Sequence, residues 1–159
     1  MKKSPRQKRS RAVAHPRQAF HPQTFTFECT GDPKEIRKVE PFLQQINEAA
    51  RLDDGTYYRL LVAGTEAVNN GILHGNKGNP NKTVHVTCVL SKDELVFRVR
   101  DQGKGFNPED VPDPLEEKNL LKTSGRGIFL MRSLMDKVSF KVSREGTEVE
   151  LVINLRHLG

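Results

Sequence analysis

Two pairs of alternating segments are the feature that most constrains the fold. In "TVHVTCVL" (83–90) and "LVFRVRD" (95–101), apolar side chains occupy every second position, and the short turn "SKDE" separates the two segments. A period of two is typical of a β-strand with one buried face, so the sequence predicts a hairpin. A second hairpin, with its turn around residues 144–146, is predicted from "KVSFKVS" and "TEVELVINL". Two such hairpins favour a largely antiparallel sheet.

Helices are predicted in three places around these hairpins. Apolar residues recur at helical spacing from Ile36 to Arg51, where Pro41 predicts a kink or a late start. The same spacing recurs over about residues 55–74, and a third helix is predicted from about residue 125 to 136. With a further strand at 24–29, the order is β-α-α-β-β-loop-α-β-β. This order favours an α+β fold in which helices cover one face of the sheet.

Positive charge is concentrated in a tail. The chain has 159 residues and a net charge of +6, and residues 1–22 contain seven basic residues and no acidic one. Removing these seven from the 26 basic residues leaves 19 against 20 acidic residues, so the rest of the chain is nearly neutral. We therefore expect a disordered tail (1–23) and one folded domain (24–158). The tail is either a solvated extension or an arm for acidic partners, and nucleic-acid binding is expected only through it.

The location of the protein is predicted from its apolar runs and its cysteines. No apolar run approaches the length of a membrane span, and residues 1–22 lack the apolar core of a secretory signal. Cys29 and Cys88 both lie on apolar strand faces, where we expect reduced thiols in the core. The sequence thus predicts a cytoplasmic protein without membrane contact.

Two polar side chains are expected to enter the sheet on its apolar face. Asp101 continues the inward-facing positions of its strand, and Thr147 continues those of the last strand. Burial of an unpaired polar group costs roughly 2–7 kcal/mol, and a charge costs more. Either these residues lie at strand ends and turn to solvent, or they face a pocket whose ligand supplies hydrogen bonds.

Glycines flank the long segment that separates the two hairpins. Residues 102–124 are rich in glycine and proline without a clear period, which indicates a functional loop. Gly103 and Gly105 open this segment, and Gly125, Arg126 and Gly127 lie where it becomes a helix. Backbone N–H groups at a helix start bind phosphate well, although such a glycine pair can also be a simple turn.

The predicted helix 55–74 carries polar residues beside its apolar stripe. Glu66 and Asn70 lie one turn apart, and His74 lies one turn further on. The pair is either an exposed polar pair or a site in which the Asn70 oxygen holds Mg²⁺ and Glu66 orients or deprotonates an attacking group. For His74 we expect only a favourable interaction with the helix C-terminus.

These segments together resemble a known superfamily. "EAVNN…HG" (66–75), "DQGKGF" (101–106), "GRGIFLM" (125–131) and "GTEVEL" (146–151) are similar to the ordered motifs of the GHKL, or histidine-kinase-like, ATPases. Within that superfamily the chain most resembles the bacterial anti-sigma-factor serine/threonine kinases, and "SLMDKV" strengthens the similarity. The resemblance implies a Bergerat-type fold, which is a two-layer α/β sandwich with a mostly antiparallel, mixed sheet. ATP would lie between sheet and helices under a lid at about residues 102–124.

The resemblance also implies roles for individual residues. Glu66 resembles the catalytic base, and Asn70 resembles the ligand of Mg²⁺. Asp101 resembles the carboxylate that accepts a hydrogen bond from the adenine amino group, and Thr147 resembles the residue that completes the adenine pocket.

The resemblance further implies that the glycines contact the phosphates or shape the lid. Gly103 and Gly105 would shape the start of the lid. Gly125 and Gly127 would cradle the phosphates, with Arg126 near their β/γ end.

The function implied is that of an ATP-dependent protein serine/threonine kinase and anti-sigma factor. It would transfer the γ-phosphoryl group of ATP to a hydroxyl of an antagonist protein and sequester a sigma factor, and a homodimer is expected from the family. At 159 residues, the chain is expected to lack the phosphoacceptor helices of a complete sensor histidine kinase. The alternative is a catalytically weak, nucleotide-dependent binding module of the same fold.

Overall fold

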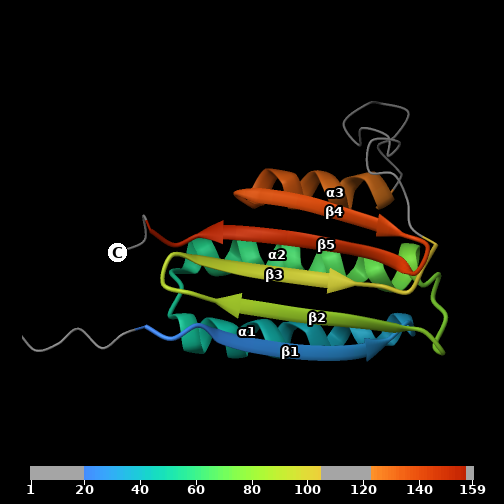
Figure 1. Cartoon of the computed structure of the whole chain (residues 1–159), viewed down its shortest axis with the longest axis horizontal. Coiled ribbons are helices and arrows are strands. Elements are labelled where there is room, and N and C mark those ends of the chain that lie inside the picture. Colours follow the sequence, from blue (N-terminus) through green and yellow to red (C-terminus); the bar gives the residue numbers. More distant parts are fainter. Residues whose placement is uncertain (1–19, 105–122, 157–159) are drawn as a thin grey trace, which may run out of the picture.

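The sheet is formed by five strands that pair antiparallel throughout. The structure, a computed structural model, describes residues 20–104 and 123–156 (Figure 1). Its strands lie in the order β1-β2-β3-β5-β4. They are β1 (Gln23–Thr30), β2 (Thr83–Leu90), β3 (Glu94–Arg100), β4 (Lys137–Ser143) and β5 (Gly146–Asn154). Both predicted hairpins are confirmed, and β3 pairs with β5 to join them. The described sheet is therefore antiparallel rather than mixed.

The first α-helix begins only at Val39, which confirms the late start that was one of the two outcomes expected at Pro41. Asp32 accepts a hydrogen bond from the Lys34 N–H at 2.9 Å and starts a 3₁₀-helix (Pro33–Lys38), which the α-helix α1 (Val39–Ala50) follows. Pro41 thus lies in the first turn of α1, where its missing N–H has no intrahelical acceptor to lose.

The predicted helix 55–74 divides into two parts. Helix α2 (Asp54–Asn70) begins at Asp53, whose carboxylate accepts from the N–H and the hydroxyl of Thr56 at 2.9 and 2.7 Å. A π-helical turn (Gly71–Gly75) follows, closed by a bond of 2.9 Å from the Asn76 N–H to the Gly71 carbonyl. Such wide turns occur frequently at functional sites.

The helices cover one face of the sheet, and the core lies between the two layers (Figure 1). Inward residues of β2, β3 and β5, among them Phe97 and Leu151, are buried against residues of α1 and α2 such as Leu60. Gly64 lies against Leu43 and Phe97, and a Cβ there would be 3.4 to 3.5 Å from their side chains. The predicted α+β fold with helices on one face is confirmed.

Both cysteines are buried free thiols, as predicted. Burial raises the pKa of Cys29 to about 11 and that of Cys88 to about 12, so both are protonated at neutral pH. Among the helices of the described residues, none is long and apolar enough to span a membrane.

Helix α3 (Thr123–Leu134) is attached to the N-terminal half of α2. The Arg59 Nε donates to the Leu134 carbonyl at 2.6 Å, and its guanidinium lies 3.3 Å from the Asp136 carboxylate. Asp136 in turn accepts from the Asn154 N–H at 2.7 Å. One arginine therefore fixes the C-terminal end of α3 to both α2 and β5.

Candidate functional site

Asp101 lies directly after β3 and is 6% exposed, so its carboxylate enters the core as predicted. Its Oδ1 accepts hydrogen bonds from the N–H groups of Gly103 and Thr147, at 2.8 and 3.1 Å. Burial raises the pKa of Asp101, and these two bonds oppose the rise because they favour the charged form. Within the described residues, no group donates to Oδ2, which is left able to accept a hydrogen bond from a ligand.

Three glycines leave room for this carboxylate. A Cβ on Gly75 would lie 2.2 Å from Asp101 Oδ2, and one on Gly146 would lie 2.0 Å from the Asp101 carbonyl oxygen. A Cβ on Gly103 would lie 2.1 Å from the carbonyl oxygen of Gly75. Gly146 also has a φ of 149°, which side chains rarely adopt. No larger residue fits at these three positions.

Thr147 faces a narrow cavity between α2, α3 and the sheet. Its side chain is 4% exposed, and the Oγ1 has no hydrogen-bond partner among the described residues. The cavity measures about 20 Å³, room for about one water molecule. It is lined by Ala67, Asn70, Gly71, Val99, Asp101, Met131, Phe140, Thr147 and Val149. Asp101 and Thr147 therefore offer polar atoms to a space whose other walls are mostly apolar.

Glu66 and Asn70 meet the start of α3. A Cβ on Gly127 would lie 2.9 Å from Glu66 Oε2 and 3.1 Å from Asn70 Oδ1. Both side chains are partly buried. The exposed polar pair that the sequence left open is thus excluded, because the two side chains face the glycine turn of α3.

Three further predicted site residues lie in the first turns of α3. Gly125 and Gly127 are buried, and Arg126 between them is exposed. Gly105 and most of the predicted lid lie outside the described residues. His74 is exposed near the end of the π-helical turn.

Asn76 is a site residue that the sequence analysis missed. It is 1% exposed, its Nδ2 donates to the Thr83 carbonyl at 2.9 Å, and its Oδ1 accepts from the Gln102 N–H at 2.8 Å. Gln102 and Thr83 are also bonded to each other, because the Gln102 Oε1 accepts a hydrogen bond from the Thr83 N–H at 2.8 Å. Asn76 therefore joins the π-helical turn, the start of β2 and the residue after Asp101. In the sequence it stands within "GNKGNPNK", which reads as an ordinary turn; only its position directly after the "HG" motif marks it.

The arrangement fits a purine nucleotide with a metal ion at its phosphates. A buried carboxylate oxygen and an unpaired hydroxyl are suited to an amino-substituted aromatic base, and the apolar walls are suited to its faces. The cavity must widen to admit such a base, since it now holds about 20 Å³. The described residues contain no group of three or more His, Cys, Asp or Glu side chains that could hold a metal. A cation here would therefore take most of its ligands from phosphate and water, which is usual for Mg²⁺.

Fold and site together define a class: a two-layer α/β domain with a small, partly polar cavity between its sheet and its helices. The family model of the histidine kinase-like ATPase domain matches residues 29–153, and the chain belongs to this family. The resemblance seen in the sequence is thereby confirmed. Membership of this family implies ATP binding.

Relatives of known name agree with this assignment. The chain is 34% identical to an anti-sigma F factor of Anoxybacillus flavithermus over 120 residues, which is 74% of this chain and 80% of the relative. It is 32% identical to an anti-sigma F factor of Oceanobacillus iheyensis over the same length and with the same coverage. A crystal structure of the RsbU and RsbW domains of a Mycobacterium tuberculosis protein shares the fold: the TM-score is 0.59 at 15% identity, over 82% of this chain and 32% of that chain.

Proposed function

We propose that this chain is an ATP-dependent protein serine/threonine kinase that also acts as an anti-sigma factor. Its main support is the meeting of Glu66, Asn70 and Gly127 at one point, which brings a carboxylate and an amide oxygen to the glycine-rich start of α3. The names of the relatives, which are anti-sigma F factors, support the regulatory half of the proposal.

In this proposal the base of ATP is held by Asp101 and Thr147. The Oδ2 of Asp101 would accept a hydrogen bond from the adenine amino group, and the Thr147 Oγ1, which has no partner among the described residues, would bond the ring directly or through a water molecule. Guanine carries an oxygen in place of that amino group. It would be rejected, because two acceptors would then face each other.

The phosphates would lie at the start of α3. Backbone N–H groups near Gly125 and Gly127 would bind their oxygens, and the exposed Arg126 would add a cation near the β/γ end. Asn70 Oδ1 would hold Mg²⁺ together with phosphate oxygens, and the ion would neutralise charge on the transferred group.

Glu66 would act as the general base. Its carboxylate would take the proton of a serine or threonine hydroxyl of the antagonist protein as that oxygen attacks the γ-phosphorus. The bond between the γ-phosphorus and the bridging oxygen then breaks, and ADP leaves with the electron pair. The products are ADP and the phosphorylated antagonist, whose release would leave the kinase with its sigma factor.

Labelling with γ-³²P ATP tests the transfer step. With Mg²⁺ and a candidate antagonist, the wild-type chain should label a serine or threonine. Glu66→Gln should reduce that labelling at least 100-fold while leaving ATP affinity within about threefold, because the side chain would take part in the transfer and not in holding the base. Asp101→Asn should instead weaken ATP binding. Binding without transfer in the wild-type chain would favour the catalytically weak binding module.

The proposed partners are a sigma factor, an antagonist with a phosphoacceptor hydroxyl, and a second copy of this chain. Size-exclusion chromatography with light scattering tests the homodimer. Genes beside the one that encodes this chain would identify the other two partners.

A further inference from the structure

Arg59 joins helix α2 to the C-terminal end of α3. Its Nε donates a hydrogen bond to the Leu134 carbonyl at 2.6 Å, and its guanidinium lies 3.3 Å from the Asp136 carboxylate. Leu134 is the last residue of α3, so its carbonyl has no donor within the helix. Arg59 supplies that donor, and its positive charge lies at the helix end where the dipole favours a cation. The side chain of Arg59 is 31% exposed, so most of it is covered by protein.

Asp136 links the same point to the sheet. Its N–H donates to the Val152 carbonyl at 2.9 Å, and its Oδ2 accepts from the Asn154 N–H at 2.7 Å. Both partners belong to β5. Arg59 therefore holds α2 against a carboxylate whose own position is fixed by hydrogen bonds to the sheet.

A second contact joins the same two helices near the start of α3. Here Gly127 lies against Glu66 and Asn70, because an added Cβ would be 2.9 and 3.1 Å from their side-chain oxygens. The two helices run antiparallel on one face of the sheet (Figure 1). Arg59 precedes Glu66 by seven residues, and Leu134 follows Gly127 by seven. At about 1.5 Å per residue, the two contacts are about 10 Å apart along either helix, so they can form together.

The two contacts differ in what they can fix. The approach at Gly127 and the burial of Ile128 and Met131 are packing interactions, which have little directionality and set how closely α3 approaches α2 and the core. Hydrogen bonds and ion pairs of an arginine have a preferred geometry, so they also limit sliding and tilting of a helix. The bonds of Arg59 are therefore suited to keep the glycine turn of α3 in place along α2.

We propose that Arg59 is a positioning residue for the phosphate-binding start of α3. This inference rests on the proposed function, in which N–H groups near Gly125 and Gly127 bind the phosphates of ATP. Those N–H groups bind well only when they point at the phosphate oxygens, so a shift or tilt of α3 would weaken phosphate binding. The bonds of Asp101 come from the N–H groups of Gly103 and Thr147 and do not involve α3. Loss of Arg59 should therefore affect the phosphates more than the base.

Hydrogen exchange tests the positioning without any nucleotide. In Arg59→Ala, the amide protons of residues 127–134 should exchange at least fivefold faster than in the wild type, because α3 loses its bonds to α2. The control is Arg98→Ala, which removes an arginine of similar exposure (39%) whose Nε donates to Glu150 at 2.7 Å. It should change exchange in α3 less than twofold. Faster exchange confined to residues 132–134 would overturn the inference, since Arg59 would then hold only the end of the helix.

Titration with two ligands tests the link to the phosphates. Isothermal titration with ATP and with adenosine, both in the presence of Mg²⁺, gives the ratio of the two affinities. Arg59→Ala should lower this ratio at least tenfold, since adenosine lacks the phosphates, and Arg98→Ala should leave it within twofold. Partial unfolding lowers both affinities equally, so the ratio separates positioning from a loss of stability. An unchanged ratio in Arg59→Ala would refute the inference.

A lysine variant tests whether the bonds themselves matter. In Arg59→Lys the ratio should be at least threefold higher than in Arg59→Ala, because an ammonium can still donate to the Leu134 carbonyl or pair with Asp136, although it lacks the planar fork of arginine. Equal ratios in the two variants would contradict positioning through these bonds. If the wild-type chain bound neither ligand, the proposed function would fail, and the exchange along α3 would decide the positioning role by itself.

Discussion

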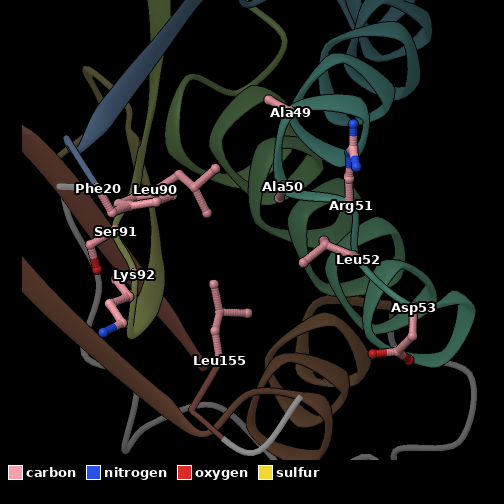
Figure 2. A pocket seen from close by; sticks show the side chains of 10 residues that line it. All are labelled: Phe20, Ala49, Ala50, Arg51, Leu52, Asp53, Leu90, Ser91, Lys92 and Leu155. Carbon is pink, nitrogen blue, oxygen red and sulfur yellow. The ribbon is translucent and has the colours of Figure 1, made fainter. Parts of the chain in front are cut away.

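The two ends of the sheet differ in how strictly they fix their atoms. At the Asp101 end, Cβ atoms on Gly75, Gly103 and Gly146 would lie 2.0 to 2.2 Å from neighbouring atoms, and the cavity holds about 20 Å³. At the other end, near the turn before β3, a cavity of about 370 Å³ (Figure 2) is lined mostly by apolar side chains, with the exposed Arg51, Asp53 and Lys92 at its edge. In the function proposed above, the first end selects its ligand through individual hydrogen bonds, whereas the second end is a wider, mostly apolar surface with exposed charged residues at its edge. Changes of a single atom should therefore matter much more at the first end.

A methyl group added at each end gives the largest contrast. Gly75→Ala places a Cβ 2.2 Å from Asp101 Oδ2 and 2.3 Å from its Cγ, so we expect ATP binding to be lost and stability to fall by about 3 kcal/mol. Gly55→Ala, at the start of α2, places its Cβ 3.3 Å from a side-chain oxygen of Asp53 and should be neutral within about 1 kcal/mol. Isothermal titration with ATP and urea unfolding measure both. Wild-type ATP affinity in Gly75→Ala would contradict the description of this end.

The second-largest loss of stability and ATP affinity is expected when the side-chain amide of Asn76 is removed. Asn76→Ala leaves the Thr83 carbonyl and the Gln102 N–H without their partner, so we expect a loss of about 2 kcal/mol and at least tenfold weaker ATP binding. The control is Asn79→Ala, which removes one exposed bond to the Asn81 N–H and should cost less than about 1 kcal/mol. If both variants unfold at the same urea concentration, Asn76 does not position the site.

The two ends should also differ in the sign of their pH dependence. The pKa of Asp101 is raised above 3.8 by burial, so the folded state binds this proton more tightly than the unfolded chain. Its contribution to the free energy of unfolding is then largest below pH 3.8 and falls as the pH rises through the raised pKa. The pKa of Asp53 is lowered by its bonds from Thr56, so its contribution is present above pH 3.8 and is lost as the pH falls through the lowered pKa.

Asparagine variants separate these two contributions. When the stability of Asp101→Asn is subtracted from that of the wild type at each pH, the difference should decrease from about pH 4 upward. The same subtraction for Asp53→Asn should give a difference that increases with pH. Thermal unfolding between pH 3 and 7 measures both profiles, and two profiles of the same sign would refute the assignment.

The smallest effect is expected for the exposed ring at the open end. Phe20→Ala should change stability by less than about 0.5 kcal/mol and leave ATP affinity unchanged, since nearly half of the ring already faces solvent. Phe97→Ala, which removes a fully buried ring from the core, should cost about 3–5 kcal/mol. A large loss in Phe20→Ala would mean that the edge of the open cavity belongs to the core.

The fold could be predicted well because its elements have regular periods. The alternation in "TVHVTCVL" and "LVFRVRD" predicts which faces pair and which are buried, and the antiparallel register follows from the short turns. The end of α2 could not be predicted this way. The apolar spacing continues past Asn70, and only the bond from the Asn76 N–H to the Gly71 carbonyl shows that the helix widens there.

The site could be predicted in part because burial of polar groups is visible in the alternation. The inward positions of Asp101 and Thr147 follow from the period of their strands. The need for Gly75 and Gly146 does not, because it arises from atoms brought together across more than 25 residues of sequence. The roles assigned to these residues remain predictions that the variants above test.

The π-helical turn after α2 has a consequence for the length of this segment. Each residue of an α-helix rotates the chain by about 100°, so the extra residue in a wide turn redirects everything that follows it. Deleting one residue between Gly71 and Gly75 would let α2 continue as an ordinary helix and would turn the Asn76 amide away from Thr83 and Gln102. Variation among natural relatives should therefore include substitutions in this segment but not insertions or deletions.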